Sequence, residues 1–152
     1  MPVYERLKNL QIELPAVSEP VASYVMYVQT GNTVYLSGHI AKKDGKPYVG
    51  QFGKGLSIEE GQLAARNIAI EMIATLEAAC AGDLGRVRQI VKLLSLVNST
   101  GDFTDHHLVT NGASELLAEV FGQKGRHARS SFGVAQIPTG ACIEMELIAE
   151  ID

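Results

Sequence analysis

The fold is decided by one apolar run near the middle of the chain, Ile90-Val91-Lys92-Leu93-Leu94-Ser95-Leu96-Val97. An almost continuous apolar run of this length is typical of a β-strand that is covered on both faces. We therefore predict a central strand over Arg86–Val97 and expect the segments on either side of it to fold against the same sheet.

The segment before this run predicts a long helix. Ser57 followed by Glu60 fits a capping box at the helix start, and Gly82 offers a C-terminal stop. Between them, apolar residues recur at helical spacing: Ala65, Ile68, Met72, Ile73, Leu76 and Cys80. We expect the face that these residues form to pack on the sheet.

A second helix is predicted after the run, from Asp105 to Phe121. Its apolar positions are Leu108, Leu116, Leu117, Val120 and Phe121. Asn111-Gly112 lies inside this segment, and a glycine there lowers the helix propensity. The helix is expected to end at Gly122 or Gly125.

A β-hairpin is predicted nearer the N-terminus. Tyr24–Gln29 and Thr33–Ile40 are rich in strand-forming residues, and Thr30-Gly31-Asn32 between them contains residues that tolerate a positive φ. The next segment, Lys42–Gly55, carries several glycines and no periodicity. It predicts a loop, and a plain connection is favoured over a lid.

The C-terminal quarter predicts a second strand pair, Ser130–Ile137 with Ala141–Ile151, joined by a turn at Pro138-Thr139-Gly140. The element order is then β-β-α-β-α-β. This order predicts an α+β domain with two helices packed on one face of a mixed sheet and a βαβ crossover at each helix. A chain of 152 residues is expected to form one domain.

Composition narrows the class of protein. The 13 basic and 17 acidic side chains give a net charge of −4, and no Lys/Arg block could follow a phosphate backbone, so nucleic acid is not an expected partner. No stretch approaches the roughly 20 apolar residues of a membrane span, and the N-terminus lacks the apolar run of a signal peptide. We expect a cytoplasmic protein in which Cys80 and Cys142 are buried thiols.

The C-terminal quarter also contains a candidate site. Arg129 opens one predicted strand, and Glu144 lies fifteen residues later on the next. An arginine can hold a carboxylate through two parallel hydrogen bonds, and a glutamate can position or deprotonate a water. The pair therefore suggests a site for a small acid. The alternative is a structural ion pair of Arg129 with Glu144 or Glu146.

Metal and nucleotide sites are not expected. His106 and His107 are adjacent and point in different directions on a helix, and neither His39 nor His127 has a ligand-type pattern nearby. The glycines of the Lys42–Gly55 loop lack the residues and the context of a phosphate-binding loop.

Several motifs together resemble the Rid proteins, the reactive intermediate deaminases. This family is also called YjgF-type and endoribonuclease L-PSP. The motifs follow the family order over roughly residues 21–150: Ser23-Tyr24-Val25, Leu36-Ser37-Gly38, Asn67, Val97-Asn98, Ala128-Arg129-Ser130, Ile137-Pro138 and Ile143-Glu144-Met145-Glu146. The Arg-to-Glu spacing and the proline between them are the specific elements.

The resemblance implies a chorismate-mutase-like fold, a homotrimer with sites in the clefts between subunits, and no metal or organic cofactor. The implied activity is hydrolysis of reactive 2-imino and enamino acids, such as 2-aminoacrylate and its tautomer 2-iminopropanoate, to the 2-oxo acid and ammonia. This is a metabolite damage-control function.

Residue roles follow from the same resemblance. Arg129 would bind the substrate carboxylate, Glu144 would orient the attacking water, and Tyr24 would border the site from a neighbouring subunit. Three further residues would contact the reacting carbon through a hydroxyl or the backbone: Ser37, Gly38 and Ser131.

The chain also departs from the archetypal members. It has His39-Ile40-Ala41 where they have a Gln and a nearby Pro. Residues 1–20 form an extension that we expect to pack on the domain of residues 21–152. These features are similar to those of a longer, mostly uncharacterised branch of the family.

Three classes of function follow. The first is imine hydrolysis. The second is a non-catalytic regulatory trimer that binds a small acid through the same arginine without needing Glu144. The third is an endoribonuclease or translation inhibitor, which the acidic composition and the lack of a basic, aromatic-studded groove oppose.

Overall fold

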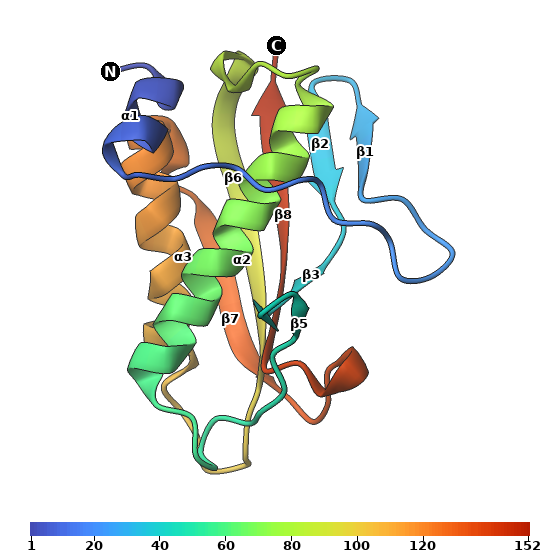
Figure 1. Ribbon diagram of the computed structural model, residues 1–152, viewed down its shortest axis with the longest axis vertical. Helices are drawn as coiled ribbons and strands as arrows, with labels where there is room; N and C mark the ends of the chain where they lie inside the picture. The colour runs from blue at the N-terminus through green and yellow to red at the C-terminus, as the bar shows by residue number, and fades with distance from the viewer.

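A long strand, β6 (Val87–Asn98), lies inside the sheet, with a paired strand on each side, in the computed structural model, which describes residues 1–152 (Figure 1). β8 (Ile143–Ile151) pairs antiparallel with one side of β6, and β7 (Ala128–Val134) pairs parallel with the other. The central strand predicted from the apolar run is therefore confirmed.

The predicted hairpin extends the sheet beyond β8. β1 (Tyr27–Thr30) and β2 (Thr33–Leu36) pair antiparallel, and the strand order is β1-β2-β8-β6-β7. A short strand, β3 (His39–Ile40), pairs with β8 farther along. β4 (Lys42–Lys43) and β5 (Lys46–Pro47) form a separate small hairpin.

The predicted pairing of the two C-terminal strands with each other is wrong. β7 and β8 lie on opposite sides of β6 instead of side by side. Helix α3 (His106–Phe121) links β6 to β7 as a crossover connection, which places β7 parallel and adjacent to β6. The link from residue 135 to residue 142, which contains the short 3-10 helix η3 (Pro138–Gly140), then spans two strand spacings, or about 10 Å.

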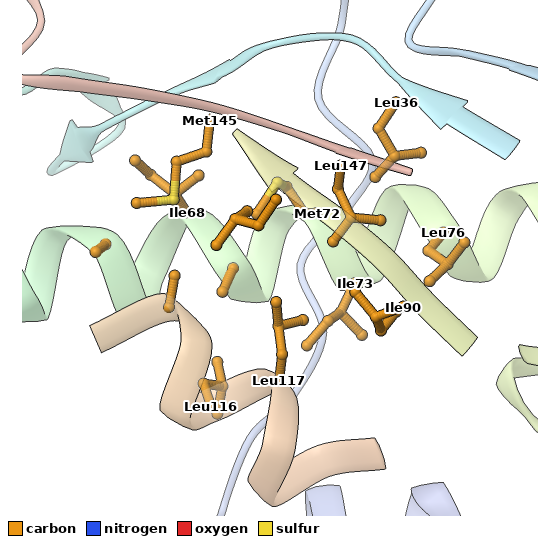
Figure 2. Packing of buried hydrophobic residues seen from close by; sticks show 14 of the residues in the cluster. Leu36, Ile68, Met72, Ile73, Leu76, Ile90, Leu116, Leu117, Met145 and Leu147 are labelled. Atoms are coloured by element: carbon orange, nitrogen blue, oxygen red, sulfur yellow. The ribbon is translucent and has the colours of Figure 1, made fainter. Parts of the chain in front are cut away.

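Two helices cover one face of the sheet, as predicted: α2 (Ile58–Ala79) and α3 (His106–Phe121). Ser57 Oγ accepts the Glu60 N–H at 3.0 Å, which caps the start of α2. The six apolar positions predicted for this helix are all buried. Figure 2 shows side chains of α2, α3 and the sheet meeting in one core.

Both helices make the predicted crossovers. The α3 crossover joins the adjacent strands β6 and β7. The α2 crossover joins β2 and β3 to β6. Each of these three strands pairs antiparallel with β8, so β2 and β3 run parallel to β6. The result is an α+β fold with a mixed sheet.

The second face of the sheet has no covering layer within the chain. Along β6, Leu93, Ser95 and Val97 are buried under the helices, whereas Leu94 and Leu96 on the opposite face are only half-buried. The predicted coverage of this strand on both faces is therefore wrong for a single chain. We call this face, which carries Leu94 and Leu96, the open face.

The first residues form a helix that the sequence did not predict, α1 (Val3–Asn9). Leu7 belongs to the hydrophobic core, and the Arg6 guanidinium donates to the Glu119 carbonyl at the end of α3. Tyr4 Oη donates to the Gly82 carbonyl beyond α2. These contacts hold the N-terminal segment against the helical layer.

The Lys42–Gly55 segment is anchored and does not form a free lid. Phe52 is fully buried, its N–H donates to the Asn98 carbonyl, and its own carbonyl accepts the Thr100 N–H. The segment connects β3 to α2 along the end of the sheet. No helix in the chain has both the length and the apolar character that a membrane crossing requires.

Candidate functional site

Arg129 projects from the edge strand β7 toward α3. It pairs in register with the buried Leu93, so its side chain lies on the helix-covered side of the sheet. Its Nη1 donates to Ser114 Oγ at 3.1 Å, and its Nη2 donates to the His107 carbonyl at 3.0 Å. No Asp or Glu oxygen lies within 4.0 Å, so the chain itself does not neutralise this guanidinium.

Ser131 lies on the same side of β7, two residues after Arg129. Its hydroxyl donates to the His106 carbonyl at 3.2 Å and lies 2.7 Å from Thr110 Oγ1. Thr110 Oγ1 is in turn 2.9 Å from Ser95 Oγ, and both residues are fully buried. The Ser131 hydroxyl is thus held at the end of a buried hydroxyl chain.

Glu144 lies on the open face, where β8 passes beside Leu96. Its carboxyl is half-buried in a pocket of about 170 Å³ that is also lined by Gly38 and Glu146. Burial, and secondarily the charge of Glu146, raises the pKa of Glu144 above its ordinary value. A carboxyl with a raised pKa is a stronger base once ionised.

Gly38, Ser37 and Tyr24 belong to the Glu144 side of the molecule. A Cβ at Gly38 would lie 2.5 Å from Glu144 Oε1, so the glycine leaves room for the carboxylate. Ser37 Oγ donates to the Val25 carbonyl at 2.6 Å. Tyr24 immediately precedes Val25 and is 42% exposed, which leaves its ring available to a neighbour.

His39 supports this segment from within the core. It is buried, with Nδ1 at 2.7 Å from the Ser37 carbonyl and Nε2 at 2.9 Å from Thr75 Oγ1. Because a carbonyl only accepts, Nδ1 carries the proton and Nε2 accepts from the threonine. Burial lowers the pKa of His39, which favours the neutral ring at neutral pH.

The predicted site residues therefore fall into two groups. Arg129 and Ser131 face α3 at the free edge of the sheet, whereas Glu144 and Gly38 lie on the open face. Strand β6 separates the two groups. A single chain does not bring the arginine and the glutamate together, and it does not form the alternative ion pair between them.

Sequence reasoning missed the residues that hold Arg129 and Ser131 in place. Ser114 and Thr110 are polar residues on a helix that was assigned by its apolar positions. Thr110 lies seven residues before Leu117, on the same buried face of α3, so its inward position was detectable from helical spacing. The carbonyls of His106 and His107 carry no sequence signal.

Two further features concern metals and the two cysteines. Nowhere in the chain do three His, Cys, Asp or Glu side chains gather in an arrangement that could hold a metal ion. Cys80 and Cys142 are buried and free, and burial raises the pKa of Cys142 to about 11. Neither thiol lies among the site residues.

Comparison with known proteins agrees with this fold. Residues 4–151 match the family model described as "YjgF/chorismate_mutase-like, putative endoribonuclease". A solved structure of a protein of unknown function from Agrobacterium tumefaciens is 39% identical, with a TM-score of 0.90 over 99% of this chain and 92% of that one. A structure from Shewanella oneidensis, described as a "putative endoribonuclease", is 33% identical, with a TM-score of 0.94 over 99% of this chain and 100% of that one.

Curated relatives point in the same direction. Protein TCP17 of Trypanosoma cruzi is 44% identical over 99% of this chain and 94% of its own length. A protein named 2-iminobutanoate/2-iminopropanoate deaminase from Dermatophagoides farinae is 31% identical over 93% of this chain and 95% of its own length. The matched motifs, the sheet order and these relatives together show that the chain belongs to the YjgF-type family of Rid proteins, with its chorismate-mutase-like α+β fold.

Proposed function

We propose that the protein is a cytoplasmic deaminase that hydrolyses reactive 2-imino and enamino acids of the 2-aminoacrylate type to 2-oxo acids and ammonia. The observation that carries the proposal is the Arg129 guanidinium, which no carboxylate of the chain neutralises. Relatives from Dermatophagoides farinae and Mus musculus that are named 2-iminobutanoate/2-iminopropanoate deaminase support the substrate class.

Arg129 is suited to hold the substrate carboxylate. An arginine has five N–H donors, and α3 accepts two of them. The remaining donors can form the parallel pair of hydrogen bonds that fixes both the charge and the orientation of a carboxylate. A lysine at this position would keep the charge and lose the fixed orientation.

Glu144 is the proposed base. It would take a proton from a water whose oxygen forms a bond to the carbon of the protonated imine, while the π electrons of the C=N bond move to the nitrogen and a carbinolamine results. The proton held by Glu144 passes to the amino nitrogen. The hydroxyl group then returns a proton to Glu144 as the C=O bond forms and the carbon–nitrogen bond breaks, which releases ammonia. The raised pKa of Glu144 suits a group that accepts and returns a proton near neutral pH. Positioning supplies the rest of the rate enhancement.

Both groups can act on one substrate only if two copies of the chain meet. The edge of β7 that carries Arg129 and the open face that carries Glu144 are different surfaces. A contact between two different surfaces is heterologous, and repetition of such a contact forms a ring when the rotation between successive copies closes. We therefore propose a homotrimer with Glu144, Gly38, Ser37 and Tyr24 from one subunit facing Arg129 and Ser131 of the next.

Turnover by single-site variants tests this proposal. Purified wild type, Arg129→Ala and Glu144→Ala would be mixed with 2-aminoacrylate generated in situ by a serine dehydratase, and 2-oxo acid and ammonia release would be measured. We expect wild type to accelerate release and both variants to lose at least about 100-fold in rate. Arg88→Ala is the matched control, because Arg88 pairs with Asp152 at the surface.

The same variants separate the two acid-binding functions. If wild type binds pyruvate but does not accelerate imine hydrolysis, and Glu144→Ala binds pyruvate equally well, the protein is a binding trimer and the deaminase proposal fails. Cleavage of RNA by rigorously purified wild type would favour the endoribonuclease function instead.

A further inference from the structure

The Arg129 guanidinium is held by a line of hydrogen bonds that passes through Ser114 and through His127, two residues before the arginine in sequence. Ser114 Oγ, which accepts from Arg129 Nη1 at 3.1 Å, lies 2.9 Å from His127 Nε2. His127 Nδ1 lies 2.6 Å from the Gly125 carbonyl. The line therefore runs from the arginine through a serine and a histidine to a backbone carbonyl.

Donor and acceptor rules limit the directions of the bonds in this line. An arginine only donates, so Ser114 Oγ accepts from Arg129. A carbonyl only accepts, so His127 Nδ1 carries a proton. In the neutral ring Nε2 is then the acceptor, and it takes the single hydroxyl proton of Ser114.

The surroundings of His127 favour this neutral state. The ring is half-buried, and burial lowers its pKa, with a smaller contribution from the positive charge of Arg129. The charged side chains that line the same shallow pocket are Arg129 from β7, Glu115 from α3 and Arg126 after the short 3-10 helix η2 (Gly122–Gly125). Two of these three charges are positive, and they oppose a further positive charge at His127.

We propose that Ser114 and His127 are positioning residues that hold the Arg129 guanidinium in the orientation required to receive a substrate carboxylate. This inference rests on the proposed function, in which Arg129 is the carboxylate anchor. The second guanidinium contact, Nη2 to the His107 carbonyl, fixes one arm of the fork. The serine and histidine fix the other arm, so rotation of the guanidinium plane is blocked.

Protonation of His127 would reverse its bond to Ser114, because Nε2 would then donate to the serine oxygen. A charged ring has no acceptor at Nε2, so the Ser114 hydroxyl would lose the partner for its proton, and two cations would stand on either side of one serine. Because the pKa of His127 is lowered, the neutral ring and the intact line persist at neutral pH and are lost as the pH falls below the ordinary histidine value. Carboxylate affinity should fall in the same range.

Binding of pyruvate, measured by titration calorimetry from about pH 8 to about pH 5, on either side of the ordinary histidine pKa of about 6.5, tests the proposal. We expect Ser114→Ala and His127→Phe to weaken binding roughly tenfold at neutral pH, the effect of losing one hydrogen bond to a charged group. The KM for the imine should rise by a similar factor, with a smaller change in kcat.

His127→Gln is the conservative rescue. A glutamine amide oxygen can replace Nε2 as the acceptor and does not titrate. We expect this variant to bind pyruvate like wild type at neutral pH and to lose the part of the pH dependence that belongs to His127. Any effect of Glu144 titration on pyruvate binding is the same in wild type and in His127→Gln, so the difference between their pH dependences reports on His127. Gln123→Ala, an exposed residue of η2, is the control and should bind like wild type.

The outcomes separate this proposal from the one on which it depends. Arg129→Ala that binds pyruvate like wild type would overturn the proposed function. Arg129→Ala that loses binding, together with Ser114→Ala and His127→Phe that keep wild-type affinity and pH dependence, would overturn only the positioning role. Thermal unfolding of each variant identifies a loss of binding that comes from a loss of fold, and a folded His127→Gln without rescue would also contradict the proposal.

Discussion

Gly38 is the residue that allows Glu144 to occupy its pocket. A Cβ at this position would lie 2.5 Å from Glu144 Oε1 and 2.9 Å from its Cδ, which is closer than real Cβ contacts. The φ of Gly38 is not positive, so an alanine would be tolerated by the backbone itself. The constraint at this position is therefore the neighbouring carboxylate rather than the conformation of the chain.

Gly38→Ala should therefore affect catalysis more than stability. The added methyl group would displace the Glu144 carboxyl by an ångström or more, and a misplacement of that size can cost about 100-fold in rate. We expect kcat for imine hydrolysis to fall by about this factor. The free energy of unfolding should drop by about 1–3 kcal/mol. Steady-state kinetics and urea unfolding measure the two effects.

Gly101→Ala is the matched control, because a Cβ there meets nothing within 4 Å and its φ is not positive. It should leave both kcat and the unfolding free energy unchanged. A Gly38→Ala protein with wild-type kcat would show that the position of Glu144 does not limit the reaction.

At the scale of elements, the close approach of α3 to α2 explains a glycine that the sequence pattern alone makes costly. A Cβ at Gly112 would lie 2.0 Å from the backbone oxygen of Gln62 on α2. The two helices are also joined by Gln62 Nε2, which donates to the Leu108 carbonyl at 3.0 Å. This contact sets the distance between the two helices, and α3 supplies the acceptors for Arg129.

Gly112→Ala should reverse the usual effect of replacing a helical glycine. On propensity alone, alanine would stabilise the helix by about 1 kcal/mol. The contact with Gln62 should instead force the helices apart and lower the unfolding free energy by about 1–3 kcal/mol. Asn111→Ala, the adjacent change on the same helix, should be neutral or slightly stabilising. Urea unfolding of both proteins decides the point, and a Gly112→Ala protein more stable than wild type would refute it.

At the scale of the whole molecule, the main unexplained feature of a single chain is the open face of the sheet. Paired residues across its strands include both apolar side chains and the acids of the proposed site. They include Tyr35, Ile148, Leu94, Leu96, Phe132, Glu144 and Glu146, together with Lys92, whose Nζ donates to Ser130 Oγ at 3.3 Å. A sheet face of this composition is expected to be buried against another layer, which a second copy of the chain would supply.

Phe132→Glu should disrupt that assembly. Phe132 is 47% exposed and lies beside Leu96 on the open face, so burial of a carboxylate there would cost several kcal/mol. We expect a trimer for wild type and a smaller species with little deaminase activity for the variant, by sedimentation and turnover at equal chain concentration. The circular dichroism spectrum should be unchanged.

Leu63→Glu provides the control for charge at an exposed apolar residue. Leu63 is 60% exposed on α2, on the opposite side of the molecule from the open face. Its substitution should change neither assembly nor turnover. A Phe132→Glu protein that remains trimeric and active would remove the open face from the proposed interface.

The accuracy of the sequence predictions differs between single elements and their arrangement. The capping signal at Ser57 and the apolar spacing that follows it predicted α2 with its buried face, because both depend on residues a few positions apart. The strand pairing at the C-terminus was predicted incorrectly, because a short link between two strands was interpreted as a hairpin. No residue pattern within the link indicates that it crosses the end of β6.

By itself, the sequence determined the two long helices with their buried faces, the existence of the central strand and the residue types of the candidate site. These features depend on local periodicity and on motifs of fixed spacing. Only the tertiary structure decided that Arg129 and Glu144 lie on different faces, and that Ser114 and His127 support the arginine. Strand order and side-chain hydrogen bonds join residues that are distant in sequence, so they are fixed only when the sheet and the helical layer come together.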